Sequence, residues 1–358
     1  MRKDLYKGLA FASLAIAFTA CESNDEPQMP TEGFKYSDGA FVLNFGSGTN
    51  SSTITHYAFA TGAVTNELFQ MQNEEALGSN GNHMCAYGAK LYTALSESGK
   101  IEITDLNGKR LKKIELKDNA SKPLSPRNLA SHGGYVYFTA YGGSVQRIDT
   151  ASLELDTKTV QVGDFPEALT VAAGKLFVNN SKYMDKNVND KGNTVSVIDP
   201  EKFEVTKTIE VATNPYNQAL TAADGNVYIV SQESWDGPHS LQRINPETYE
   251  VTKLGDGSVI AAHGNKLYVY YSLWGGDTWF KTYDLTTDEY SAENFLDASG
   301  FSYIQALNVN PANGDLYISD SVSKQKGKIV IYNAEGNKKH TFEVGYSPNG
   351  TFFPTLKK

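Results

Sequence analysis

The residues that could carry out chemistry in this chain are few and scattered. The six histidines show neither the HxxxH nor the HExxH spacing that would place two imidazoles on one metal ion. They are His56, His83, His132, His239, His263 and His340. No Gly-x-Ser-x-Gly nucleophile elbow and no phosphate-binding P-loop occurs. The sequence therefore predicts no catalytic residue, no metal site and no catalytic cofactor, and we expect a protein that is not an enzyme.

Two weaker patterns could hold an ion. Residues 183–192 carry oxygen ligands at alternate positions, as calcium loops do. However, Asp190 stands where such a loop needs Gly, and Ser196 stands where it needs Glu. A plain polar loop is therefore the favoured interpretation. His239 could be an axial ligand, but a solvated histidine is the commoner role.

The composition narrows the fold and the partners. The chain of 358 residues contains 21 Tyr, 17 Phe, 3 Trp and 31 Gly, and 20% of its residues are charged. Disordered, collagenous and coiled-coil chains need biases that are absent here. A net charge of −9 argues against binding to nucleic acid, which needs a basic face. The profile suits many short strands joined by turns.

A short motif recurs seven times along the chain. It consists of a Gly or turn residue, a polar residue and then an aliphatic-aromatic-aliphatic run, as in Gly264-Asn-Lys-Leu-Tyr-Val269. Its central positions are 42, 92, 137, 177, 228, 268 and 317, at intervals of 40 to 51 residues. That period is typical of β-propeller blades, each of which is a four-stranded sheet.

Each unit contains signals for three further strands. A strand that ends in an Asp or Asn turn follows the motif, as at Asp149 and Asp199, and an alternating strand comes next, as in residues 203–211. A short strand that begins with proline precedes the motif, as at Pro126 and Pro166. We therefore predict an all-β fold over residues 34–358, a seven-bladed β-propeller of four-stranded blades.

The two ends of the repeat array predict how the ring closes. The array begins near the second strand of a unit, and residues 347–353 match the opening strand of the other units. The C-terminal strand is expected to be the innermost strand of the first blade, which closes the ring and removes an exposed sheet edge. A β-helix or an open solenoid would not need this offset, and its repeats are usually shorter.

The aromatic residues outside the repeat motif gather in one set of loops. In propellers, the loops between second and third strands and the loops between blades open on one face around the axis. All three tryptophans fall in or beside these loops, which favours an aromatic platform for a large, flat, amphipathic ligand over packing between blades. The candidate ligand-binding residues are Trp235, Trp274, Trp279, Tyr141, Tyr183, Phe165, Tyr216, Tyr303 and Tyr346.

Residues 1–20 predict a lipoprotein signal peptide. A basic start precedes an apolar run of 13 residues, too short to span a bilayer, which needs about 20. Cys21 then follows small residues, as in a bacterial lipobox, so we expect cleavage before Cys21 and lipidation of its thiol. A secretory signal with a chance cysteine is the alternative.

Residues 21–33 predict a flexible tether, because they are polar and acidic and contain two prolines. Removal of residues 1–20 leaves a net charge of −11. The other cysteine, Cys85, lies in an apolar stretch with nothing nearby to activate it, so we expect a buried and inert thiol.

The signal, Cys21 with its acidic followers Glu22, Asp25 and Glu26, and the seven units with Gly-x-Leu-Tyr-Val and Val-Ile-Asp-Pro patterns resemble the YncE-like lipoprotein propellers. Within that class the chain is most similar to the BtuG-type cobalamin-binding surface lipoproteins. The resemblance covers nearly the whole chain, and its motifs specify the blades rather than a ligand site.

The resemblance implies capture of cobalamin (vitamin B12) or a related corrinoid and its handover to a TonB-dependent outer-membrane transporter. It also implies a lipid anchor in the outer membrane, with the propeller facing the cell exterior. Cobalamin would be a bound ligand and not a catalytic cofactor. The alternatives are a carbohydrate-binding surface propeller, a propeller lyase or hydrolase, and a scaffold without a small ligand.

Overall fold

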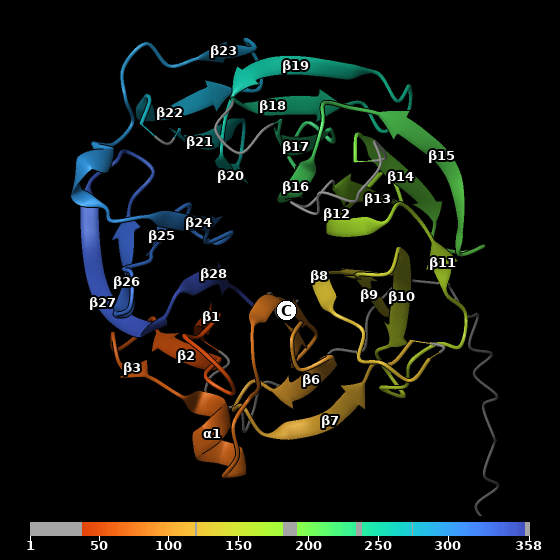
Figure 1. The fold of residues 1–358 in the computed structure, drawn as a ribbon. Helices are drawn as coiled ribbons and strands as arrows, with labels where there is room; N and C mark the ends of the chain where they lie inside the picture. Colours follow the sequence, from red (N-terminus) through yellow and green to blue (C-terminus); the bar gives the residue numbers. More distant parts are fainter. Residues whose placement is uncertain (1–37, 119, 182–191, 234–237, 274, 355–358) are drawn as a thin grey trace, which may run out of the picture.

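The computed structural model describes residues 38–118, 120–181, 192–233, 238–273 and 275–354. These residues form seven four-stranded antiparallel sheets arranged as the blades of a ring (Figure 1). The predicted seven-bladed propeller is thereby confirmed. The innermost strand of each blade contacts the innermost strands of both neighbouring blades, so the ring is continuous.

Within each blade the strands follow one another from the axis of the ring outward to its rim. In that order, blade 1 has β28 (Pro348–Phe352), β1 (Gly39–Asn44), β2 (Thr53–Ala58) and β3 (Val64–Thr65), and blade 2 has β4 (Gly81–Tyr87), β5 (Lys90–Leu95), β6 (Lys100–Asp105) and β7 (Arg110–Glu115). Blade 3 has β8 (Pro126–His132), β9 (Tyr135–Ala140), β10 (Ser144–Asp149) and β11 (Val160–Gln161), and blade 4 has β12 (Phe165–Ala172), β13 (Lys175–Ser181), β14 (Thr194–Asp199) and β15 (Glu204–Glu210). Blade 5 has β16 (Pro215–Thr221), β17 (Val227–Gln232), β18 (His239–Ile244) and β19 (Val251–Asp256). Blade 6 has β20 (Val259–His263), β21 (Lys266–Ser272), β22 (Thr278–Asp284) and β23 (Glu289–Tyr290), and blade 7 has β24 (Ile304–Val309), β25 (Leu316–Asp320), β26 (Lys326–Tyr332) and β27 (Lys338–Tyr346).

The last strand of the chain closes the ring, as the sequence predicts. β28 pairs antiparallel with β1, with Phe352 opposite Phe41 and Thr351 opposite Val42. Blade 1 therefore combines one strand from the C-terminal end with three from the N-terminal end. Closure pairs a sheet edge that would otherwise expose unpaired N–H and C=O groups.

The aromatic residues of the repeat motif form the cores between blades. All six lie in second strands and are at most 2% exposed: Tyr92, Tyr137, Phe177, Tyr228, Tyr268 and Tyr317. Each apolar cluster joins two neighbouring blades; Tyr92 of blade 2, for example, packs with Val136 and Phe138 of blade 3. Burial of a large apolar side chain contributes about 1.5–3 kcal/mol. The motif therefore supplies the contacts that hold adjacent blades together.

The Asp or Asn at the end of each third strand has a local role. The Asp149 Oδ1 accepts hydrogen bonds from the backbone N–H groups of Ala151 and Ser152, at 3.0 and 2.7 Å. Asp199 repeats this arrangement in blade 4. Such Asx turns stabilise a reversal of the chain, because the carboxylate accepts hydrogen bonds from backbone N–H groups that no longer pair with a neighbouring strand. The recurring Ile-Asp motif is therefore a turn signal and not a ligand site.

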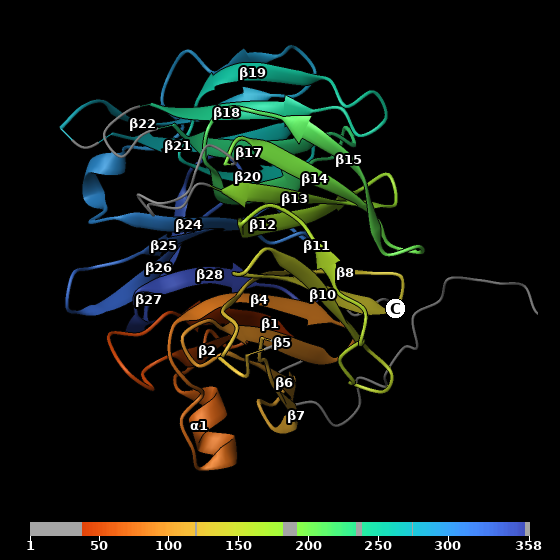
Figure 2. The same ribbon diagram turned by 45° about the vertical axis from the view of Figure 1, so that its right-hand side comes forward.

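A helical insert between blades 1 and 2 departs from the predicted all-strand pattern. The α-helix α1 (Leu68–Asn73) lies between β3 and β4 and projects from the rim (Figure 2). Leu68 and Phe69 are buried, whereas Met71 is 62% exposed. A short 3₁₀ helix, η1 (Ala298–Gly300), lies between blades 6 and 7.

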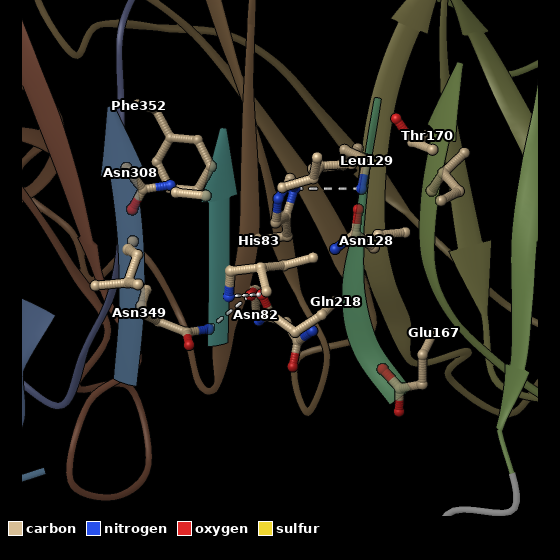
Figure 3. Close-up of a pocket in the computed structure, with 18 of the residues that line it drawn as sticks. Asn82, His83, Asn128, Leu129, Glu167, Thr170, Gln218, Asn308, Asn349 and Phe352 are labelled. Carbon is tan, nitrogen blue, oxygen red and sulfur yellow. Dashed lines mark hydrogen bonds between the residues drawn. The ribbon is translucent and has the colours of Figure 1, made fainter. Parts of the chain in front are cut away.

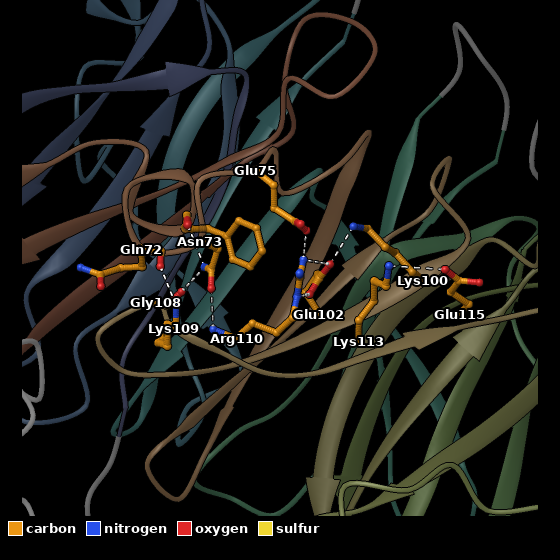
Figure 4. A network of polar contacts seen from close by, with 11 residues as sticks. Gln72, Asn73, Glu75, Lys100, Glu102, Gly108, Lys109, Arg110, Lys113 and Glu115 are labelled. Atoms are coloured by element: carbon orange, nitrogen blue, oxygen red, sulfur yellow. Dashed lines mark hydrogen bonds and ion pairs between the residues drawn. The ribbon is translucent and has the colours of Figure 1, made fainter.

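A polar network fastens this insert to the outer edge of blade 2 (Figure 4). The Arg110 Nε donates to the Glu102 Oε2 at 2.8 Å, and the same guanidinium pairs with Glu75 and lies 5.1 Å from the Phe69 ring centroid. Glu102 is fully buried and also accepts from the Lys100 Nζ at 2.7 Å. Its two cationic partners offset the cost of burying the Glu102 charge. Through Arg110 the same network links the insert to blade 2.

The described residues contain no helix long and apolar enough to cross a membrane. The predicted signal peptide, Cys21 and the tether lie outside the described residues. Cys85 is half-buried among the apolar residues between blades 2 and 3, and burial raises the pKa of its thiol to about 11. This thiol is therefore protonated at neutral pH, in agreement with the predicted inert role.

Candidate functional site at the channel mouth

A cavity of about 580 Å³ runs along the axis of the ring. All seven innermost strands line it, and it therefore belongs to no single blade. Figure 3 shows how polar side chains from neighbouring strands face this common space. Its lining includes a set of amides, Asn80, Asn82, Asn128, Gln218, Gln305, Asn308 and Asn349.

Six of the seven innermost strands shift register near their first residues, which is the mark of a β-bulge. Each places a polar side chain within the shifted stretch. These residues are Asn82, Arg127, Glu167, Tyr216, Gln305 and Asn349, and all line the cavity. Bulges redirect a side chain out of the regular alternation. β20 has a regular register, and the residue that it contributes near its start is the apolar Ile260.

We call the end of the cavity at which the innermost strands begin the channel mouth. Hydrogen bonds join these residues from blade to blade around it. The Gln305 Nε2 donates to the Asn349 Oδ1 at 3.3 Å, and the Asn349 Nδ2 donates to the Asn82 backbone oxygen at 2.6 Å. The Asn82 Nδ2 then donates to the Arg127 backbone oxygen at 2.8 Å. We call Asn82, Gln305 and Asn349 the amide belt. It links blades 7, 1, 2 and 3.

The belt ends at a buried ion pair between blades 3 and 4. The Arg127 Nε donates to the Glu167 Oε2 at 3.0 Å, and the Tyr141 hydroxyl donates to the Glu167 Oε1. The guanidinium also lies 4.6 Å from the centroid of the Tyr141 ring. Glu167 is 1% exposed, and its burial raises the pKa of the carboxyl against the opposing effect of the Arg127 charge. This geometry fixes the positions of Arg127 and Tyr141 before any ligand arrives.

His83 lines the same cavity one residue after Asn82. Its Nδ1 accepts a hydrogen bond from the Leu129 backbone N–H at 3.3 Å, and its ring lies edge-on to Phe352 at 5.1 Å. Burial lowers the pKa of His83 to about 4. The imidazole is therefore neutral at physiological pH, with its proton on Nε2.

The other side of the mouth is fixed by hydrogen bonds from side-chain amides to backbone groups. The Asn179 Nδ2 donates to the backbone oxygens of Tyr216 and Gln218, at 3.0 and 3.1 Å, which joins blade 4 to blade 5. The Gln218 Oε1 accepts from the Ile260 backbone N–H at 3.3 Å, which joins blade 5 to blade 6. Between blades 6 and 7 the contacts are apolar, from Ala261 to Ile304 and Leu307.

A family model described as a domain of unknown function, DUF5074, matches residues 38–357. The chain belongs to the DUF5074 family. No curated protein matches it.

Solved structures similar to this DUF5074 propeller share its fold at low identity. A quinonprotein alcohol dehydrogenase-like protein from Bacteroides thetaiotaomicron is 19% identical, with a TM-score of 0.66, over 89% of this chain and 79% of that one. Hydrazine synthase from Kuenenia stuttgartiensis is 16% identical, with a TM-score of 0.58, over 79% and 89%. The β-propeller domain of Cps50 (Swd1) from Myceliophteria thermophila is 12% identical, with a TM-score of 0.59, over 83% and 98%. At these identities the similarity establishes the propeller fold alone.

Three of the aromatic residues predicted to bind ligand gather at the channel mouth of the DUF5074 propeller. Tyr216 lines the cavity itself. The Tyr141 hydroxyl donates to the Glu167 carboxylate of the ion pair, and the Tyr141 ring meets that of Phe165 edge-on at 5.2 Å. Of the predicted ligand-binding residues, Tyr141, Phe165 and Tyr216 thus lie at or beside this candidate site.

The remaining predicted residues lie elsewhere or outside the described residues. Trp279 is half-buried in the seam between blades 5 and 6, with ring centroids 5.2 Å from Tyr271 and 5.6 Å from Tyr290. Tyr303 is 58% exposed just before β24, and Tyr346 ends β27 beside a separate cavity of about 470 Å³. Trp235, Trp274, Tyr183 and Cys21 lie outside the described residues.

The amide belt is not among the residues predicted from the sequence. A signal exists for Asn349, because it follows Pro348 as Arg127, Glu167 and Tyr216 follow the prolines of β8, β12 and β16, and all four fall at a bulge and line the cavity. Single Asn or Gln residues in short irregular strands do not reveal this placement until the strands are arranged in a ring.

Within the described ranges, no group of three or more His, Cys, Asp or Glu residues is placed to hold a metal ion. Most of the stretch weighed as a calcium loop, residues 183–192, lies outside those ranges. The His239 Nδ1 is 2.8 Å from the Ser258 Oγ, and burial lowers the pKa of this imidazole.

Proposed function

We propose that this protein is a non-catalytic binding protein that captures cobalamin or a related corrinoid at the channel mouth. The observation that carries the proposal is the polar mouth built from six bulged strands, with amides on blades 7, 1 and 2 and Tyr141, Phe165 and Tyr216 beside them. Binding sites of this kind combine a few fixed polar groups with aromatic contact area.

The chemistry of the mouth matches the rim of a corrin. A corrinoid is large, flat and bordered by amide groups, and each amide offers both a donor and an acceptor. Asn and Gln side chains are its natural partners, because they also offer both. The cavity of about 580 Å³ suits groups that project from such a ligand, while the corrin macrocycle would lie over the mouth.

Preorganisation of the mouth supports tight binding of a ligand. The Arg127 and Tyr141 side chains are fixed by the buried Glu167, and the Asn349 side chain is fixed by blade 2. A site whose groups are ordered before binding loses little side-chain entropy when the ligand arrives. We further propose that a lipid on Cys21 anchors the protein to the outer face of the outer membrane and that a TonB-dependent transporter receives the ligand.

Isothermal titration of purified residues 21–358 with cyanocobalamin tests the proposal. We expect binding, visible also as a pink complex on gel filtration, and a weakening of at least about tenfold in Tyr216→Ala/Gln305→Ala, since tenfold corresponds to about 1.4 kcal/mol. Met71→Ala, at an exposed site on α1, is the control and should bind like the wild type. Absence of both heat and co-elution would overturn the proposal.

A further inference from the structure

A second and larger cavity lies at the opposite end of the ring from the channel mouth. It measures about 1,070 Å³ and follows the outer part of the seam between blades 7 and 1, where β27 lies next to β2 (Figure 1). Its walls come from the start of β1, the β2–β3 turn, the β24–β25 turn and the start of β27. This volume is slightly above the usual range for small-molecule sites, about 300–1,000 Å³.

This seam lacks a bridge that four of the other six seams have among the described residues. Among the described residues, four seams are bridged at this end by a basic side chain that reaches the turn between the third and fourth strands of the next blade. The bridges are Lys90 Nζ to Thr150 O at 3.3 Å, Arg147 Nη1 to Pro200 O at 2.9 Å, Lys175 Nζ to Pro246 O at 3.1 Å and Arg243 Nη1 to Asp288 Oδ1 at 2.6 Å.

Blade 7 has a carboxylate at the position that Lys90 and Lys175 occupy in their blades. Asp315 precedes the buried Leu316 as Lys90 precedes Leu91. It accepts from the Lys339 Nζ of its own blade at 2.6 Å, so that lysine does not cross to blade 1. The corresponding turn of blade 1, which contains Phe59 and Gly62, instead forms a wall of the open cavity.

The polar side of the cavity is built in advance. The Asp315 side chain is 9% exposed, and the Asn313 Nδ2 donates to its Oδ2 at 2.9 Å, beside the bond from Lys339. No described residue donates to the Asp315 Oδ1. Because the charges of Asp315 and Lys339 compensate each other, the pair offers donors and acceptors with little net charge, which suits neutral hydroxyl groups.

The apolar side of the cavity is an aromatic shelf. The Tyr57 ring stacks on Phe342 with centroids 4.5 Å apart and an interplanar angle of 7°, and it also stacks with His340 at 5.7 Å. Phe59 lies 6.2 Å from Tyr57 and is 37% exposed. Tyr57, Phe59 and His340 all line the cavity. Packing against Phe342 fixes the Tyr57 and His340 rings, so a flat ligand gains contact area without ordering these two rings.

We propose that this seam cavity, defined by Tyr57, Phe59, Asp315, Lys339 and His340, is a binding site for a neutral glycan. The C–H face of a pyranose ring lies on the aromatic shelf. Two neighbouring hydroxyls reach the pair at the polar side, one donating to the Asp315 Oδ1 and one accepting from Lys339. A further carboxylate, Asp38 at the cavity edge, disfavours acidic sugars.

Native electrophoresis of residues 21–358 in gels cast with starch, mixed-linkage β-glucan, xylan or galactomannan tests the proposal. We expect at least one polysaccharide to retard the protein. Phe59→Ala/His340→Ala should abolish the retardation with an unchanged melting temperature, because both side chains are exposed. Asp315→Asn should weaken it about tenfold, the effect of one charge-assisted hydrogen bond.

Two controls separate this site from the channel mouth. Tyr216→Ala/Gln305→Ala should be retarded like the wild type, and Phe59→Ala/His340→Ala should bind cyanocobalamin like the wild type, because the two sites lie at opposite ends of the ring. Migration that is unaltered in all four gels, or equal retardation of the Phe59→Ala/His340→Ala variant, would overturn the proposal.

Discussion

The Asn349 side chain, near the end of the chain, donates a hydrogen bond to the backbone oxygen of Asn82 in the second blade at 2.6 Å, across 267 residues of sequence. The same Nδ2 also lies 3.2 Å from the Gly81 oxygen. One amide therefore links the closing strand of blade 1 to the inner strand of blade 2, at the mouth proposed to bind ligand. Asn349 therefore contributes both to the stability of the closed ring and to the lining of the proposed binding site.

Replacement of Asn349 by Ala should destabilise the protein by about 1–2 kcal/mol, since a typical intramolecular hydrogen bond contributes about 0.5–1.5 kcal/mol. Urea unfolding followed by tryptophan fluorescence measures the change. Asn337→Ala, at an exposed position of blade 7, is the matched control and should alter the free energy of unfolding by less than about 0.5 kcal/mol. Equal effects of the two substitutions would contradict the bridging role of Asn349.

His83 should make the protein less stable in mild acid. Burial lowers its pKa from 6.5 to about 4, so the folded state binds a proton less readily than the unfolded chain. The stabilising contribution of the neutral ring is complete above pH 6.5 and is lost as the pH falls toward 4. Linkage sets an upper limit of about 3 kcal/mol, reduced by water in the channel.

The difference between the wild type and His83→Gln in urea unfolding at pH 7 and pH 4.5 isolates this contribution. The raised pKa of Glu167 acts in the opposite direction, because it favours the folded state as the pH falls, but it is present in both proteins and cancels. His340→Gln is the control and should retain the full acid sensitivity of the wild type. If His83→Gln loses as much unfolding free energy between pH 7 and pH 4.5 as the wild type does, the prediction is wrong.

Glu167→Ala should destabilise the protein by about 3–5 kcal/mol, because it leaves the Arg127 guanidinium buried without its carboxylate. The double variant Arg127→Met/Glu167→Leu should recover much of this loss, since no unpaired charge remains. A double-mutant cycle with Arg127→Met and Glu167→Leu as the single variants measures the coupling. The exposed pair Lys112–Glu154, also in contact at 2.6 Å, is the control, and its coupling should not exceed about 1 kcal/mol.

Arg110→Met should loosen the α1 insert and leave the ring intact. The substitution removes the contacts of Arg110 with Glu75 and Glu102. Hydrogen exchange should become faster for the amides of Met71 and Glu74, which bond within the insert, while exchange in blades 3 to 6 stays the same. Lys113→Met, which removes only an exposed contact with Glu115, should change neither. Uniform acceleration over all blades would show that the network supports the whole ring instead.

The fold could be predicted from the sequence because its signals repeat. The aromatic residue of each second strand, such as Tyr92 or Tyr317, is buried for the same reason in each unit, and seven weak signals at one period become a strong one. The closing strand could be predicted for the same reason, from the offset of the repeat. The α1 insert could not, because only Leu68 and Phe69 pack and nothing repeats.

The channel mouth could be predicted only in part. Tyr141, Phe165 and Tyr216 are conspicuous in the sequence because they are aromatic residues outside a repeat motif. Asn82 and Asn349 are not, because their role depends on contacts between residues far apart in the chain, and these exist only in the closed ring. The packing of Trp279 between blades also depends on a neighbour, Tyr290, whose position the local sequence does not specify.

The pairing of β28 with β1 sets an order of events during folding. Blades 2 to 7 each consist of consecutive strands, so they can assemble one after another as the chain emerges. Blade 1 lacks its inner strand until β28 is available, and its pairing with β1 closes a loop of roughly 300 residues. Closing this loop costs conformational entropy, and that cost grows only slowly with loop length. The chain therefore remains an open arc until β28 is free to pair, and it becomes a ring only when β28 docks on β1.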